Sequence, residues 1–284
     1  MDPSEPEIYL PDAEKFAPAA ALEQALAATT HLGVAAHPDD LEIMAIDGIL
    51  KGFSVNGNLF SGVVLTAGSG APRAGMYSAL SDAELAALRK EEQKEAARIG
   101  RYGALLFLNF NSQDVKQGSS VVESLAQVLR AARPRFVYTH NLLDAHPTHS
   151  AAGWRVIQAL RSLPEGLLPE QVYGCEVWRG LDWLPARWRV AFDCSEHLEL
   201  QKELLQVFKT QVESGKRYDR AIPGRRAANA GMREPNSVDK ARALVFALDL
   251  NPLMRDKTLS PRAYLREILK DFEQEALSTL PEDA

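Results

Sequence analysis

A chain of 284 residues with 46% hydrophobic and 25% charged residues has the composition of an ordinary globular protein. At this length, one large domain buries about three quarters of the surface that its unfolded chain exposes. The formal net charge of -6 argues against nucleic acid or an anionic membrane surface as the main partner, because both require a basic footprint on the protein.

The N-terminal segment and the cysteines indicate the compartment. The chain begins MDPSEPE, which is acidic and proline-containing rather than basic and then apolar, so we do not interpret it as a signal peptide. We find no run of the roughly 18 apolar residues that a membrane span needs. Cys175 and Cys194 lack the spacing of a disulfide framework or a Cys-x-x-Cys zinc site, and we interpret them as buried thiols. We therefore expect a cytoplasmic protein with an N-terminal extension at residues 1–28.

Apolar runs and helical patterns alternate along the chain. We expect strands at residues 32–35, 59–66, 104–108, 136–138, 172–178 and 188–192. We expect helices at residues 22–28, 41–51, 81–99, 121–132, 150–161, 196–212, 237–250 and 261–277. This alternation indicates βα units, whose right-handed crossovers place successive strand ends on one edge. The expected fold class is α/β: a Rossmann-like, doubly wound, mostly parallel sheet with helices on both faces and an added β-rich and helical C-terminal part.

The first chemical motif follows the first predicted strand directly. Residues 37–42 read HPDDLE, and the proline stiffens the turn so that His37 and Asp40 converge while Asp39 projects differently. An imidazole nitrogen and a carboxylate oxygen suit Zn²⁺ or a similar divalent ion, and the second carboxylate is then free for proton transfer. The simpler interpretation is that one of the two aspartates only caps the helix that follows.

A histidine cluster follows the strand predicted at residues 136–138. Three of the six histidines of the chain, His140, His146 and His149, lie within ten residues of each other. Ligands of open α/β sheets bind at the carboxyl ends of the strands, so both clusters are expected at the same edge. Together they supply a His, Asp, His ligand set, which weakens the capping interpretation.

A glycine-rich turn, AGSGAP at residues 67–72, follows the second predicted strand. Such a turn could bind a phosphate, but it has neither the dinucleotide fingerprint nor the lysine of a P-loop. We favour a mobile active-site loop over a nucleotide site.

A basic cluster stands out in this acidic chain. Five cationic residues fall within residues 216–226, among them Lys216, Arg225 and Arg226. One hypothesis is that one of these three side chains binds an anionic group of the substrate, since guanidinium forks match phosphate and carboxylate. The alternative, equally weighted, is a solvated loop or an interface patch.

The motifs resemble those of a known family. Residues 37–42 resemble the His-Pro-Asp-Asp-x-Glu signature of the LmbE-like, or PIG-L, zinc-dependent de-N-acetylases, and residues 146–149 (HPTH) resemble their second His-x-x-His motif. Arg89, Glu92 and Gly100 match the spacing of the family's conserved helix, and Thr210 with Gln211 resembles its later Ser-Gln. The resemblance covers residues 30–215, and its first motif is highly specific.

The resemblance implies roles for named residues. His37, Asp40 and His149 would hold the metal, Asp39 would be the general base, and His146 would be the general acid or the group that stabilises the oxyanion. The implied cofactor is Zn²⁺, with Fe²⁺ or another divalent ion as the alternative, because a His₂-Asp set accepts either.

The resemblance also implies substrate contacts. Arg89 would contact sugar hydroxyls, and Asp114 is the nearest match to a substrate-contacting Asp of the family; its other interpretation is a turn or cap residue. The sequence departs from the family at Thr148, where an Asp commonly pairs with the counterpart of His146. Asp144 is then the alternative partner for His146.

The implied function is a metal-dependent hydrolase that removes an N-acetyl group from a small molecule containing N-acetylglucosamine, neutral or anionic. The alternatives are an amidase acting on a larger sugar-amide conjugate and a non-catalytic carbohydrate-binding protein. We expect one LmbE-like domain at residues 29–284, with a catalytic core at residues 30–215 and a helical part at residues 216–284. A nucleic-acid or membrane partner is not expected, and a homo-oligomer is compatible with the sequence.

Overall fold

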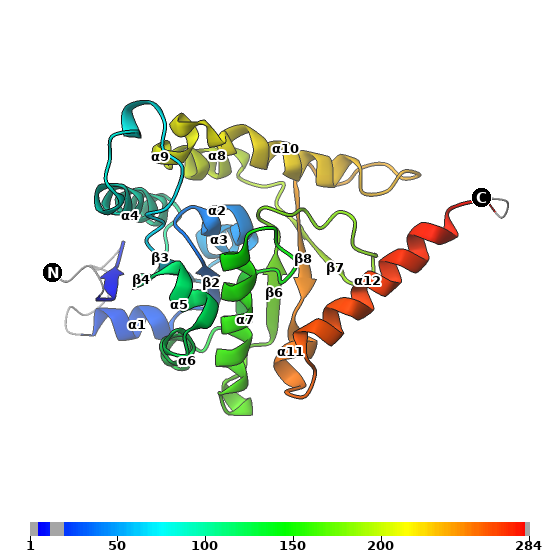
Figure 1. Cartoon of the computed structure of the whole chain (residues 1–284), viewed down its shortest axis with the longest axis horizontal. Coiled ribbons are helices and arrows are strands. Elements are labelled where there is room, and N and C mark those ends of the chain that lie inside the picture. Colours follow the sequence, from blue (N-terminus) through cyan, green and yellow to red (C-terminus); the bar gives the residue numbers. More distant parts are fainter. Residues whose placement is uncertain (1–4, 12–19, 282–284) are drawn as a thin grey trace.

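The computed structural model of the protein describes residues 5–11 and 20–281. Its centre is an eight-stranded sheet (Figure 1) with the strand order β1-β4-β3-β2-β5-β6-β8-β7. The strands are β1 (Glu7–Tyr9), β2 (His31–Ala35), β3 (Phe60–Thr66), β4 (Leu105–Phe110), β5 (Phe136–His140), β6 (Gln171–Cys175), β7 (Arg189–Asp193) and β8 (Leu244–Asp249).

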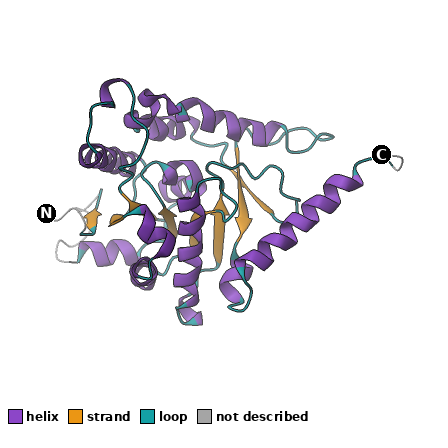
Figure 2. Ribbon diagram, viewed as in Figure 1, coloured by secondary structure: helices purple, strands orange, loops and turns teal. Residues whose placement is uncertain are grey.

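Helices cover both faces of the sheet, as Figure 2 shows. The α-helices are α1 (Ala21–Ala27), α2 (Asp40–Met44), α3 (Ile46–Ser54), α4 (Asp82–Ile99), α5 (Ser112–Gln117), α6 (Ser120–Ala132), α7 (Pro147–Arg161), α8 (Leu198–Gln206), α9 (Lys209–Gln211), α10 (Tyr218–Gly231), α11 (Asn251–Arg255) and α12 (Pro261–Ser278). Shorter turns are η2 (Gly75–Tyr77), η3 (Glu165–Leu167) and the π-helical η4 (Val212–Lys216). None of the helices in the described ranges has the length and apolar character that a membrane crossing needs.

Alternating side chains of the strands build two apolar cores. Val63 of β3 packs in one core with Leu125 of α6, whereas the next residue, Val64, packs in the other with Ile49 of α3. Successive strand residues point to opposite faces, and a strand covered on both faces is apolar throughout. All seven residues of β3 are accordingly buried.

The strand order places a crevice beside β2. The strands β4, β3, β2, β5 and β6 are parallel, with β3 on one side of β2 and β5 on the other. The chain therefore adds β3 and β4 on one side of β2 and then β5 and β6 on the other side. Ligands of open α/β sheets bind at such a switch point, which here lies between β2 and β5. This arrangement confirms the predicted α/β fold with a mostly parallel sheet.

The structure corrects three of the predicted elements. The predicted helix at residues 237–250 is wrong, because residues 244–249 form the strand β8, which pairs antiparallel with both β6 and β7. The C-terminal part is therefore not purely helical, since one of its strands lies inside the sheet. The predicted helix at residues 41–51 is divided into α2 and α3 at Ala45, and the one at residues 196–212 ends at Gln206 before the short α9.

The predicted N-terminal extension is partly built into the fold. Strand β1 pairs antiparallel with β4, and α1 supplies the expected short helix. The rest of the extension, residues 1–4 and 12–19, lies outside the described residues. The predicted capping box at the start of α4 is present, with Ser81 accepting from the backbone N–H of Glu84.

Candidate functional site

The motif after β2 turns sharply at Asp39. Its φ of 89° lies in the left-handed region, which a residue with a side chain adopts only where its surroundings hold it. The backbone N–H of Asp39 donates to Gln93 Oε1 at 2.9 Å, and the backbone N–H of His37 donates to Asp40 Oδ2 at 2.8 Å. These two bonds close the turn, so both aspartates leave it in fixed directions.

The three predicted metal ligands converge. His37 Nδ1 lies 3.1 Å from His149 Nε2 and 3.2 Å from Asp40 Oδ2, and His149 Nε2 lies 3.4 Å from Asp40 Oδ2. In a tetrahedral zinc site with bonds of about 2.0–2.1 Å, neighbouring ligand atoms stand about 3.3 Å apart. The three donor atoms therefore have the mutual spacing of one face of a zinc coordination sphere.

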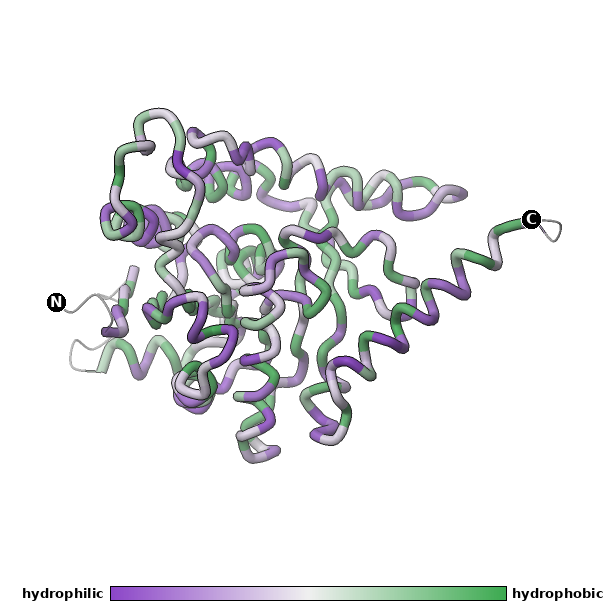
Figure 3. Tube along the Cα trace, viewed as in Figure 1, coloured by the Kyte–Doolittle hydropathy of each residue, from purple (hydrophilic) through white to green (hydrophobic). Residues whose placement is uncertain are grey.

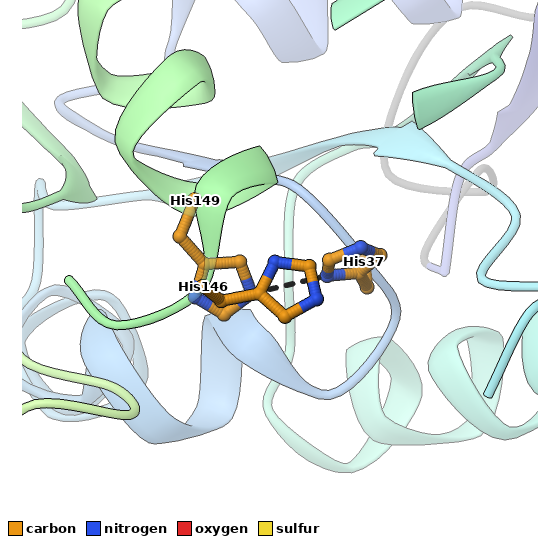
Figure 4. Close-up of side chains that lie close together, drawn as sticks. All are labelled: His37, His146 and His149. Carbon is orange, nitrogen blue, oxygen red and sulfur yellow. Dashed lines mark hydrogen bonds between the residues drawn. The ribbon is translucent and has the colours of Figure 1, made fainter. Parts of the chain in front are cut away.

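The remaining two histidines of the cluster are placed differently, as their hydrogen bonds show. His140 Nε2 accepts from the backbone N–H of Ala36 at 2.9 Å, so the lone pair that faces Asp40 is already used. His146 caps α7, and its Nδ1 accepts from the backbone N–H of Thr148 at 3.3 Å. The proton of a neutral His146 ring is therefore assigned to Nε2. Figure 4 shows the ring of His146 gathered with those of His37 and His149.

Asp144 lies against His149, a predicted metal ligand, rather than against the ring of His146. Its Oδ1 lies 3.4 Å from His149 Nδ1 and accepts from the backbone N–H of His146 at 2.8 Å, while Oδ2 accepts from that of Trp178 at 3.0 Å. Burial would raise the pKa of Asp144, but the His149 ring and these N–H groups hold it below its usual value. Asp144 bonds the backbone of His146 and not its ring, so the suggested side-chain pair is not formed; Asp144 instead lies behind His149, where a carboxylate that orients a metal-binding histidine would stand.

Asp39, the predicted general base, is held by Arg89. Arg89 Nη2 donates to Asp39 Oδ2 at 2.8 Å and to the carbonyl of Pro38 at 2.6 Å, and Nη1 donates to the carbonyl of Gly68 at 3.0 Å. Burial raises the pKa of Asp39 well above its usual range, although the charge of Arg89 opposes this effect. A carboxylate whose pKa moves toward neutrality is a better base for a water molecule.

These groups open into a cavity of about 710 Å³, within the usual range for small-molecule sites. The glycine-rich turn at residues 67–72 forms one part of its lining, and residues 109–112 after β4 form another. Trp178, Tyr218, Lys216 and Arg225 also line it. The expected role of residues 67–72 at the site thus agrees with their position.

The predicted substrate-binding residues divide into two groups. Arg89 and Arg225 line the cavity, whereas Asp114 and Arg226 do not. Asp114 Oδ2 accepts from the backbone N–H of Asn111 in the capping box of α5, which is its alternative role. Arg226 is buried and donates to Gln201 Oε1 and to two backbone carbonyls of α2, so it fastens α10 to the body of the protein.

Several supporting residues were missed at the level of the sequence. Glu42 is fully buried and accepts from Tyr102 Oη at 2.6 Å and from Gln93 Nε2 at 2.8 Å. Burial raises the pKa of Glu42 to about 7, with the hydrogen bond from Tyr102 opposing it. Gln93 thus binds both Glu42 and the backbone of Asp39. The motif itself contains Glu42, but nothing in one sequence distinguishes Gln93 from other polar residues of α4.

Known proteins resemble this chain in sequence and in structure. Residues 32–160 match the family model described as GlcNAc-PI de-N-acetylase (PIG-L). N,N'-diacetylchitobiose deacetylase from Pyrococcus horikoshii, solved with its inhibitor MPG, has a TM-score of 0.57 and 21% identity over 84% of this chain and 89% of that chain.

Two other solved structures share the fold. GalB, the 4-carboxy-2-hydroxymuconate hydratase from Pseudomonas putida, has a TM-score of 0.61 and 20% identity over 78% of this chain and 96% of that chain. The conserved protein TT1542 from Thermus thermophilus has a TM-score of 0.58 and 22% identity over 76% of this chain and 93% of that chain. The matched segment includes both motifs, so the resemblance inferred from them is confirmed: residues 32–160 match the PIG-L (LmbE-like) de-N-acetylase family.

Proposed function

We propose that the protein is a metal-dependent hydrolase that removes the N-acetyl group from a small molecule containing N-acetylglucosamine. The observation that carries this proposal is the convergence of His37, Asp40 and His149 donor atoms at 3.1–3.4 Å, with the carboxylate of Asp39 beside them. Two imidazoles and one carboxylate suit Zn²⁺ and also Fe²⁺ or another divalent ion. The membership of residues 32–160 in a de-N-acetylase family supports the same reaction.

The side chains divide the work of amide hydrolysis. Zinc held by the three ligands would polarise the acetyl carbonyl and bring the pKa of water down toward about 7. Asp39, oriented by Arg89, takes the proton of the attacking water. The Nε2–H of His146, on the far side of the ring from the Nδ1 that accepts from Thr148, donates a hydrogen bond to the oxyanion, and Asp39 passes the proton that it took from the water to the leaving amine. The products are acetate and a free amine.

Two alternatives use the same cavity. An amidase that cleaves a larger sugar-amide conjugate would need no change in the ligands, and a non-catalytic carbohydrate-binding protein would keep the cavity alone. One protein with this fold is named a hydratase, so the fold does not by itself select hydrolysis. A location in the cytoplasm, a small-molecule partner and the absence of a nucleic-acid or membrane partner stay predictions of the sequence.

The test is acetate release from a panel of N-acetylglucosaminyl compounds by the zinc-loaded protein, with and without a chelator. Release that the chelator abolishes is expected. Asp39→Asn is expected to keep its metal and to lower kcat by about 10² to 10⁴, the range of general acid–base catalysis. A fully active Asp39→Asn protein would overturn the assignment of the base. Failure of every compound, with metal bound, would favour the conjugate amidase or the binding protein.

A further inference from the structure

Four side chains form one wall of the cavity, which we call the cationic wall: Lys216, Trp178, Tyr218 and Arg225. The Nζ of Lys216 lies over the ring of Trp178, 4.8 Å from its centroid. The rings of Trp178 and Tyr218 meet edge to face with their centroids 6.0 Å apart. Arg225 donates to the backbone carbonyl of Val177, which holds its guanidinium beside Trp178.

Neither cation of this wall forms an ion pair with a carboxylate in the described part of the chain. Among the described residues that line the cavity, Arg89 is paired with Asp39. Among the described residues, no Asp or Glu oxygen lies within 4.0 Å of the side-chain nitrogens of Lys216 or Arg225, the distance limit for an ion pair. This is so even though the protein carries a net charge of -6. Neighbouring Arg217, outside the cavity, is paired with Asp219. The positive charges of Lys216 and Arg225 therefore face the cavity without an ion-pair partner, and they attract an anion there.

The wall also offers an aromatic surface close to the metal ligands. Trp178 is 42% exposed, and it lines the cavity. The pKa of Tyr218 is raised by its burial and by the nearby carboxylates of Asp39 and Asp40. Tyr218 thus contacts Trp178 and lines the same cavity as Asp39 and Asp40. Trp178 thus offers an aromatic face to a sugar ring in the same cavity as the predicted metal ligands.

We infer that the substrate carries an anionic group, a carboxylate or a phosphate, which binds between Lys216 and Arg225 while its ring contacts Trp178. This inference rests on the proposed function and adds the substrate class to it. Of the three cations in the anion-binding hypothesis, Lys216 and Arg225 line the cavity and Arg226 does not, because Arg226 lies on the buried side of α10. In this arrangement the acetamide lies at the metal ligands and the anionic group lies at the cationic wall. The cavity therefore selects a substrate that carries both groups.

The experiment compares kcat/KM for neutral and anionic members of matched pairs. The methyl glycoside of N-acetylglucosamine is paired with its 6-phosphate and with a glycoside that bears a carboxylate, which separates the two anion sources. We expect wild type to prefer an anionic member by about tenfold or more, because hydrogen bonds to charged groups are strong. Lys216→Gln and Arg225→Gln should each lower kcat/KM for that member about tenfold more than for the neutral member.

Arg220→Gln is the matched control, since Arg220 is exposed on the same helix α10 and does not line the cavity. It should behave like wild type with every compound. Equal kcat/KM for neutral and anionic compounds, or variants that lower both alike, would overturn the inference while the deacetylase proposal stands.

A protein that hydrolyses none of the compounds would instead contradict the proposed function. The wall is then tested by calorimetric titration with the 6-phosphate itself. Tighter binding to wild type than to the Lys216→Gln/Arg225→Gln double variant supports the wall, and equal binding overturns it.

A separate surface lies on α12, which leaves the body of the protein toward its C-terminal end (Figure 1). Tyr264 and Ile268 anchor its first turns in the core. On this helix Leu269, Phe272 and Leu277 are 45%, 37% and 60% exposed, and Leu280, just beyond its end, is 56% exposed. Figure 3 shows hydrophobic segments recurring along this projecting helix. Exposed apolar residues that recur at helical spacing form a stripe that normally packs on a partner.

The charges beside this stripe are self-complementary. Arg266 and Glu273 line the same shallow groove as Leu269 and Leu277, and they are two helical turns apart. Among the described residues, neither has an ion-pair partner of opposite charge. If two copies of α12 pack antiparallel about a two-fold axis near Leu269, Arg266 of each copy faces Glu273 of the partner subunit. A two-fold interface forms each such contact twice.

We propose that a second copy of this chain covers the stripe through antiparallel pairing of the two α12 helices. Sedimentation equilibrium of the full chain is expected to give a concentration-dependent dimer. Arg266→Glu and Glu273→Arg should each weaken the dimer, because like charges then meet, and the double variant should restore it. Glu275→Arg, on another side of the helix, is the charge-matched control. A wild type that stays monomeric, or a double variant as weak as the singles, would overturn the proposal.

Discussion

The two sides of the cavity differ in how their polar side chains are held. On the side of β2 and α7, Asp40 and His149 are almost wholly buried, and their polar atoms lie against one another. On the cationic wall, Trp178 is 42% exposed and Lys216 has no acidic partner in the described part of the chain. The side chains of the first side hold one another in place, whereas the two cations of the second form no ion pair with an acidic residue in the described part of the chain.

This difference separates the residues that carry out the reaction from the residues that select the substrate. Groups that polarise a carbonyl or move a proton act best when their geometry is set before the substrate arrives. Groups that select a substrate gain most when the ligand supplies the missing partner, because the charge is otherwise left to solvent. Substitutions on the β2 and α7 side should therefore abolish activity with every substrate, while those on the cationic wall should change only the choice among them.

The largest effect is expected at the ligand His149. His149→Ala removes one of three donors, and we expect loss of bound metal and a fall in kcat of at least about 10³, since metal assistance is worth several kcal/mol. Metal content per chain and acetate release measure the two effects. His197→Ala is the control, because His197 is exposed and bonds Ser54. Full metal content in His149→Ala would show that the ligand set is different.

A smaller effect is expected at Asp144, which orients His149 through Oδ1. Asp144→Asn keeps the shape but removes the charge, and we expect metal affinity to fall by about 10- to 100-fold, the usual cost of losing a carboxylate behind a metal-binding histidine. Titration against a competing chelator measures this, and excess metal should restore activity. Asp114→Asn, which removes only the carboxylate of a helix cap, should leave affinity unchanged. Equal affinities for the two variants would exclude the orienting role.

The difference between the two sides also decided how much could be predicted from the sequence. His37, Asp40 and His149 lie in short motifs directly after predicted strands, and the parallel sheet dictates that strand ends meet, so their convergence followed from local pattern and topology. The cationic wall could be predicted only in part. Neighbouring residues of a helix point about 100° apart, so Arg225 faces the cavity while Arg226 is buried.

The missed elements have related causes. Pro223 and Gly224 argued against a helix at residues 218–231, yet tertiary packing, including the buried Arg226, supports α10 there. The run of residues 244–249 (LVFALD) has neither helical nor alternating periodicity, because β8 is buried on both faces. Such a run cannot be assigned from periodicity alone.

A local test of the Asp39 support uses two glycines of the same turn. Gly68 has a φ of +65°, and a Cβ there would collide with the guanidinium of Arg89, whereas a Cβ on Gly70 would meet nothing. We expect Gly68→Ala to lower the free energy of unfolding by about 1 to 3 kcal/mol and to lower kcat with every substrate, since Arg89 must move away from Asp39. Gly70→Ala should stay within about 0.5 kcal/mol of wild type in chemical denaturation. Equal stability and activity of the two variants would show that Arg89 is not held as described.

The smallest effect concerns stability far from the cavity entrance, at His31 on β2. Burial, with Lys51 adding to it, lowers the pKa of His31 to about 4, while an unfolded histidine titrates near 6.5. Between these values the unfolded chain binds a proton that the folded protein refuses, so the free energy of unfolding falls as the pH drops from about 6.5 to about 4. His31→Gln removes this contribution, and we expect its stability to fall less than that of wild type across this window, by about 1 to 2 kcal/mol.

Denaturant titrations at several pH values measure the difference, which should be constant above pH 7, where His31 is neutral in both states. Parallel pH profiles for the two proteins would mean that His31 accepts its proton in the folded state.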